Sequence, residues 1–84
     1  MQILVNDRAY EVRLKAAAWP YLMKLSRVFA GEPVTVQELE EAEQAVFRIC
    51  VIGEIREEDR EQLLVKILSA FTRLIAEEFK TFRP

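Results

Sequence analysis

The 84-residue sequence predicts a single α+β domain over residues 1–84, with an N-terminal two-stranded antiparallel hairpin followed by three helices. Three observations lead to this fold class. Apolar and polar residues alternate over residues 2–14, apolar residues recur every three or four positions from residue 20 onward, and helix-capping or helix-ending residues separate the periodic stretches. The helices are expected at about 20–30, 36–52 and 57–82.

The hairpin has an apolar face that other parts of the protein must cover. Asn6-Asp7 lies between its two strands, and both residue types tolerate the positive φ that a tight hairpin turn requires. A lone hairpin is barely stable in water, so the helices are expected to pack on this face. Its residues are Ile3, Val5, Tyr10, Val12 and Leu14.

The first helix is expected to begin at Pro20, because proline suits the first position of a helix, and to end before Gly31. Its predicted inner stripe consists of Leu22, Leu25 and Phe29.

The second helix has the clearest boundary in the chain. Thr35 and Glu38 have the spacing of a capping box, and Val34 and Leu39 occupy the positions of a hydrophobic staple. We therefore expect Thr35 to be the N-cap. The apolar stripe of this helix is Leu39, Ala42, Val46 and Ile49.

The third helix is long and carries a wide apolar stripe. About 25 residues at 1.5 Å each form a rod of about 37 Å, which is longer than a compact body of this size, so its distal turn should project. Exposed apolar surface of that extent usually marks a protein interface. The alternative is that the hairpin and the first helix cover it within one chain. The candidate interface residues are Phe71, Leu74, Ile75, Phe79 and Phe82.

Charge is distributed unevenly along the chain. Residues 1–31 carry a net charge of +3, residues 32–61 carry −7 and residues 62–84 carry +2, which gives the total of −2. A nucleic-acid-binding domain usually has a strong basic excess. A basic end combined with an acidic middle instead favours charge-complementary contact between elements or between subunits.

Aromatic side chains lie among cations around Pro20, and such a surface can stack bases and hold phosphates. The structural alternative, which we favour, is that Trp19 closes the open end of the hairpin and Tyr21 lies at the edge of the core. The candidate basic and aromatic surface consists of Arg13, Lys15, Trp19, Tyr21, Lys24 and Arg27.

The composition argues against catalysis, cofactors and metals. The chain has no histidine, so Cys50 would lack its usual base and zinc its usual ligands. Cys50 lies between apolar residues and is expected to be a small buried hydrophobe. The two glycines are isolated and form no phosphate-binding loop. The acidic residues from Glu54 to Glu61 are expected to be a solvated helix start rather than a cation site.

The order of elements resembles that of the small tail assembly chaperones of tailed bacteriophages. The resemblance rests on the hairpin Ile3-Leu4-Val5-Asn6-Asp7-Arg8-Ala9-Tyr10-Glu11-Val12-Arg13-Leu14, followed directly by helices. Members of that family form oligomers and coat the extended tape measure protein while the tail tube polymerises. The resemblance implies that the apolar face of the second and third helices binds a client or another copy.

The predicted function is that of an oligomeric, non-enzymatic protein-binding module whose partner is another copy or an extended client protein. The alternative is a small nucleic-acid-associated regulator that uses the basic hairpin and first helix. Because the N-terminus lacks the pattern of a signal peptide and no apolar run is long enough to span a membrane, a cytoplasmic location and no membrane partner are expected.

Overall fold

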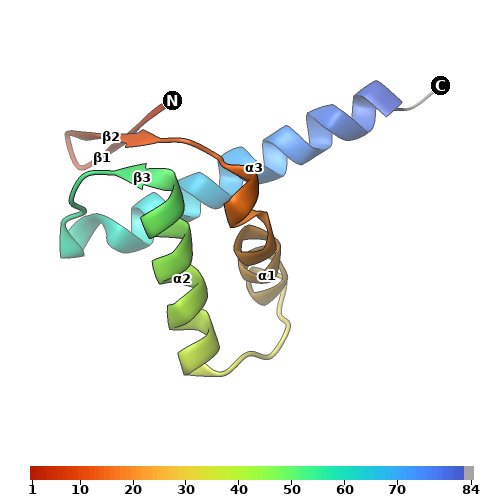
Figure 1. Ribbon diagram of the computed structural model, residues 1–84, viewed down its shortest axis with the longest axis horizontal. Coiled ribbons are helices and arrows are strands. Elements are labelled where there is room, and N and C mark those ends of the chain that lie inside the picture. The colour runs from red at the N-terminus through yellow and green to blue at the C-terminus, as the bar shows by residue number, and fades with distance from the viewer. Residues whose placement is uncertain (83–84) are drawn as a thin grey trace.

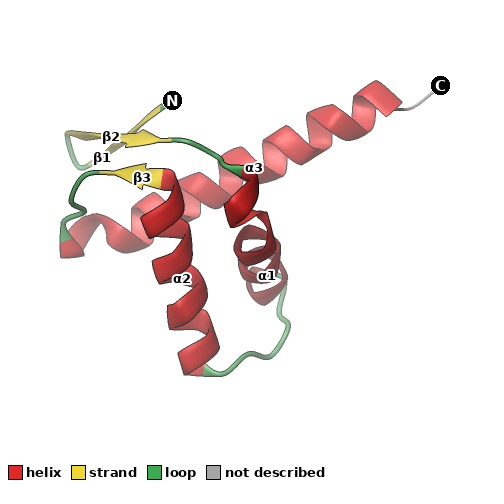
Figure 2. Ribbon diagram, viewed as in Figure 1, coloured by secondary structure: helices red, strands yellow, loops and turns green. Residues whose placement is uncertain are grey.

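The computed structural model describes the backbone of residues 1–82 and the side chains of residues 1–77. Within this part of the chain, a three-stranded antiparallel sheet in the order β1-β2-β3 packs against three α-helices (Figure 1). The predicted α+β class is therefore confirmed. Figure 2 shows the strands along one side of the fold, with α1 and α2 extending away from them and α3 crossing behind.

The predicted hairpin forms, with β1 at Gln2–Val5 and β2 at Arg8–Val12. Asn6 and Asp7 have φ angles of 49° and 65°, so both turn residues adopt the left-handed conformation that the pair was expected to tolerate. The paired strands end at Val12 rather than at residue 14. The register pairs Ile3 with Tyr10, which places their side chains on the same, buried face.

A third strand, β3 at Val51–Ile52, takes the place of the last two residues of the helix predicted at 36–52. It pairs antiparallel with β2, so that Val12 lies opposite Val51. The Arg13 amide also donates a hydrogen bond of 2.8 Å to the carbonyl of Cys50. The helix ends at Cys50, since Val51 has an extended backbone and pairs with Val12 of β2 instead of continuing the helix.

The helices lie close to their predicted positions. α1 spans Trp19–Phe29 and follows the 3-10 turn η1 at Ala16–Ala18, while α2 spans Val36–Cys50. The Thr35 hydroxyl accepts a hydrogen bond of 3.1 Å from the Glu38 amide, which confirms the predicted N-cap of α2. The 3-10 turn η2 at Glu57–Asp59 precedes α3 at Arg60–Phe82. Figure 1 shows the last turns of α3 extending beyond the rest of the fold, as its length predicted.

The core lies where the sheet, α1 and α2 meet the middle of α3. Phe71 is completely buried there, and its ring packs edge-to-face against Trp19 with 5.6 Å between ring centroids. The same buried cluster includes Val5, Val12, Leu22, Leu25, Val46, Cys50, Leu63 and Ile67.

A buried carboxylate joins the hairpin to the start of α3. Asp59 is completely buried, and its oxygens accept hydrogen bonds from Asn6 Nδ2 at 2.8 Å, from Arg8 Nη1 at 3.0 Å and from the Tyr10 hydroxyl. The residue that precedes η2 adds a bond to this network, since the Arg56 amide donates to the Tyr10 oxygen at 3.4 Å. The expectation of a solvated helix start is therefore wrong for Asp59, because three side-chain donors replace its water.

These donors lower the pKa of Asp59. The Tyr10 hydroxyl makes the largest contribution and Asn6 the next, while Arg8 adds a hydrogen bond and a positive charge; together they outweigh the opposing effect of desolvation. A carboxylate whose pKa is lower in the folded state stabilises the fold above its unfolded-state pKa. That stabilisation is lost as the pH falls through the folded-state pKa.

We therefore expect the free energy of unfolding of Asp59→Asn to depend less on pH in the acidic range. Between about pH 5 and about pH 2 the free energy of unfolding of the wild type should fall more steeply than that of the variant. Asp59→Asn should also be less stable at neutral pH, because the side-chain NH₂ group of asparagine would face the hydrogen-bond donors of Asn6, Arg8 and Tyr10. Urea denaturation at several pH values measures both effects. Asp7→Asn, which changes an exposed carboxylate in the turn, is the matched control, and parallel curves for wild type and Asp59→Asn would contradict the prediction.

Phe71→Ala should destabilise the protein by about 3–5 kcal/mol, because it removes a buried ring and leaves a cavity beside Trp19. Because 1 kcal/mol corresponds to about 4–8 °C in a domain of this size, the unfolding midpoint should fall by more than about 10 °C. Thermal denaturation followed by circular dichroism tests this. Thr72→Ala, at the adjacent exposed position of the same helix, should leave the unfolding midpoint nearly unchanged.

Candidate functional site

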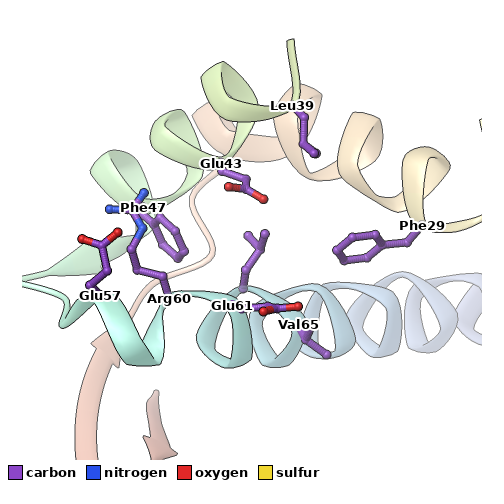
Figure 3. A pocket seen from close by; sticks show the side chains of 9 residues that line it. Phe29, Leu39, Glu43, Phe47, Glu57, Arg60, Glu61 and Val65 are labelled. Atoms are coloured by element: carbon purple, nitrogen blue, oxygen red, sulfur yellow. The ribbon is translucent and has the colours of Figure 1, made fainter. Parts of the chain in front are cut away.

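An open groove separates the α1–α2 pair from α3. It consists of two adjoining pockets of about 630 Å³ and 480 Å³ that share Phe29 and Val65. Figure 3 shows the first pocket with Leu39 and Phe47 on α2, Phe29 at the end of α1 and Val65 on α3. All of these positions belong to helices, so the groove is a cleft between helical surfaces.

Apolar side chains in this groove remain exposed. Phe29 is 56% exposed and Val65 is 48% exposed, although both are large hydrophobic residues. Phe29 was predicted to belong to the inner stripe of the first helix; that prediction is wrong, while Leu22 and Leu25 are fully buried as expected. Phe29 is the last residue of α1, and its side chain points into the pocket between α2 and α3 (Figure 3), where its ring remains mostly exposed.

The end of the groove near η2 is acidic. Glu43, Glu57 and Glu61 lie around this end together with one cation, Arg60. The Arg60 guanidinium lies 5.1 Å from the centre of the Phe47 ring, which is a cation–π distance. Burial raises the pKa of Glu43; Arg60 opposes this rise, while the negative charges of Glu40 and Glu61 add to it.

The opposite end of the groove is weakly polar and carries a cation. Small side chains line it, and Arg73 of α3 lies at its margin. The remaining lining residues of this pocket are Ser26, Leu68, Ser69, Thr72 and Ala76. The groove therefore runs along α3 from a negative end to a positive end.

The groove combines apolar and charged side chains. Within the described residues, no group of three or more histidine, cysteine, aspartate or glutamate side chains could hold a metal ion. Cys50 is buried in the core and its burial raises the pKa of the thiol, which disfavours the nucleophilic thiolate form. The groove offers apolar area, three carboxylates and two guanidinium groups, which can bury a partner's apolar side chains and pair with its charges.

The predicted interface residues differ in how far they are buried. Phe71 is fully buried inside the chain, so its assignment to an interaction surface is corrected: Trp19 and the other core residues already cover it. Leu74 and Ile75 are half-buried on α3. The side chains of Phe79 and Phe82 lie outside the described residues.

The residues of the predicted basic and aromatic surface also differ in their exposure and in their neighbours. Trp19 is half-buried against Phe71 of α3, whereas Tyr21 is 37% exposed. Lys24 Nζ lies 3.7 Å from Glu38, and Arg27 Nε lies 3.9 Å from Glu32, so both cations have acidic neighbours. Arg13 and Lys15 are exposed.

The groove was not predicted from the amino-acid sequence. Its signal is present in α3, where Val65 falls outside the apolar stripe formed by Leu64, Leu68 and Phe71 and so indicates a second apolar surface. No comparable signal distinguishes Phe29, because its spacing from Leu22 and Leu25 is that of a buried residue.

Within residues 1–82, no helix is both long enough and apolar enough to cross a membrane. Comparison of the chain with protein-family models, with curated proteins and with solved structures finds no match.

If the groove is open as described, Phe29→Ser should change the free energy of unfolding by less than about 1 kcal/mol, because the ring is mostly exposed. Leu25→Ala, one turn earlier on α1 and fully buried, should cost about 2–5 kcal/mol. Urea denaturation of the two variants distinguishes them. Equal losses would mean that another part of the chain covers Phe29.

Proposed function

We propose that this chain is a non-enzymatic protein-binding module that takes an apolar segment of another polypeptide into the groove between the α1–α2 pair and α3. The observation that carries the proposal is the exposure of Phe29 on α1 and Val65 on α3, which both line one groove. Large apolar side chains gathered in a cleft lose contact with water when a partner binds, and this drives association.

The charges around the groove favour a polypeptide partner over a nucleic acid. Glu43, Glu57 and Glu61 at one end would repel phosphates. The cations of α1 that the alternative function requires, Lys24 and Arg27, have acidic neighbours within 4 Å. A protein segment with an apolar face and mixed charges fits both ends of the groove.

The resemblance of the hairpin and the element order to phage tail assembly chaperones supports one named class within this proposal. In that case the groove would bind a segment of an extended client such as a tape measure protein, or another copy of the chaperone. The proposal includes a cytoplasmic location, because the cytoplasm is the compartment in which such assembly occurs.

A photo-crosslinking amino acid at position 65 tests the function directly. In the cells from which the chain comes, Val65→benzoylphenylalanine should produce a discrete adduct, because position 65 lies in the groove. The same substitution at Gln37, an exposed position on α2 outside the groove lining, is the matched control and should produce none. Adding Phe29→Glu should abolish the adduct, since it places a charge in the apolar part of the same groove.

An adduct of two copies and an adduct with a different protein both support the proposed function. Its absence at position 65, or equal labelling at positions 65 and 37, would overturn it. Circular dichroism of each variant shows whether the fold is retained.

A further inference from the structure

We propose that the groove binds an amphipathic helical segment of another protein, with a lysine or arginine of that segment placed among Glu43, Glu57 and Glu61. The inference rests on the proposed function, because it names the chemistry of the occupant of the same groove. It follows from the carboxylates at one end of the groove, from the apolar side chains beside them and from the helices that form its walls.

The carboxylates at the acidic end of the groove lack cationic partners within the chain. Among the side chains that the structure describes, no lysine or arginine nitrogen lies within 4 Å of a carboxylate oxygen of Glu43, Glu57 or Glu61. By contrast, Glu38 of the same helix as Glu43 pairs with Lys24 at 3.7 Å. The acidic end of the groove therefore keeps a negative charge that a cation of a partner can compensate.

Arg60 does not neutralise this end of the groove. It is the only cation among the described residues that line the first pocket, and its guanidinium lies over the Phe47 ring, 5.1 Å from the ring centre. Burial raises the pKa of Glu43, and the charges of Glu40 and Glu61 add to this rise against the opposing effect of Arg60. A further positive charge at this place would stabilise the ionised carboxylate.

Apolar side chains lie in the same pocket as the carboxylates. In the view of Figure 3, the side chains of Glu43 and Glu61 lie between Phe47 and Phe29. Lysine and arginine have long aliphatic stems that pack on apolar surface while their charged ends contact polar groups. One basic side chain can therefore contact the apolar lining and also reach the carboxylates. Apolar residues next to it in the same segment can then cover the exposed surfaces of Phe29 and Val65.

The shape of the groove favours a helix as the occupant. Its walls are helices, whose backbone groups are already hydrogen-bonded, so an extended strand would find no backbone partners there. A helix satisfies its own backbone. The groove runs along α3 from Glu61 to Arg73, a distance of about 18 Å, so about three turns of a partner helix would fill it. Small side chains at Ser69, Thr72 and Ala76 allow that helix to approach closely.

The free edge of β1 offers a weaker docking site. The Lys66 ammonium group donates a hydrogen bond to the carbonyl of Leu4, so a side chain of α3 already occupies a backbone acceptor of β1. The groove, by contrast, has exposed apolar residues and carboxylates without ion pairs in one place.

Binding of designed peptides tests the chemistry of the occupant. The probe is a fluorescently labelled peptide of about five helical turns, with leucines on one face and lysines at one end. A matched peptide has glutamates in place of the lysines. In fluorescence anisotropy the wild-type chain should bind the lysine peptide at least about tenfold more tightly than the glutamate peptide, because only lysines can pair with the carboxylates of the groove. A third peptide, with serines in place of the leucines, should bind at least about tenfold more weakly, since it cannot cover Phe29 and Val65.

Variants of the chain locate the binding site for the lysine peptide. The double variant E57Q/E61Q should weaken its binding by about three- to tenfold in Kd, because two exposed ion pairs are lost and each is weak. The matched control is E41Q/E54Q, which removes two exposed carboxylates outside the groove lining and should leave the affinity nearly unchanged. Charge reversal in E57K/E61K should give a chain that prefers the glutamate peptide. Circular dichroism shows that each variant is folded.

The possible outcomes are distinct. Equal affinity for the lysine and glutamate peptides, or equal weakening by E57Q/E61Q and E41Q/E54Q, would overturn the inference. So would a serine peptide that binds as tightly as the leucine peptide, because attraction to charge alone would then explain the binding. If the crosslink at position 65 joins the chain to another copy of itself or to a segment without lysine or arginine, the proposed function survives and only the chemistry of the occupant is wrong.

Discussion

The rest of the fold depends on the burial of one carboxylate. Asp59 lies at the end of η2, where the chain enters α3, and its three side-chain donors all come from the hairpin. A buried charge is tolerated only when its partners are in place, so this contact specifies how the hairpin sits against the start of α3. The same contact sets the position of Arg60 and Glu61, which follow directly in the chain and form the acidic end of the groove. The hydrogen bonds of Asp59 therefore also help to position the acidic end of the candidate groove.

Local signals predicted the elements well. The alternation over residues 2–14 predicted the hairpin, and the Thr35 capping box predicted the start of α2, because each depends on interactions between residues close in sequence. What could not be predicted depends on contacts between distant residues. The strand β3 forms only because β2 offers it an edge, and Asp59 is buried only because donors some 50 positions earlier in the chain reach it. Sequence patterns within a helix do not contain this information.

The candidate site, too, could be predicted from the sequence only in part. An apolar surface beyond the needs of a small core was predicted for α3, and exposed apolar side chains are present on this helix, but at Val65 rather than at Phe71. Periodicity identifies which residues share a helix face, and it does not show how far a neighbouring helix extends over that face. Phe29 illustrates this limit, because its spacing is that of a core residue while its place at the end of α1 leaves it uncovered.

The contact between Lys66 and Leu4 has a consequence for how copies can add to one another. Strands with unsatisfied backbone groups at the border of a sheet are templates for unlimited growth by strand addition. Here the ammonium group occupies a carbonyl along one border, and at the other border β3 has only two residues before Gly53, at a φ of 94°, ends it. Neither border offers a long, flat template. Growth by strand addition is thus discouraged at both borders of the sheet.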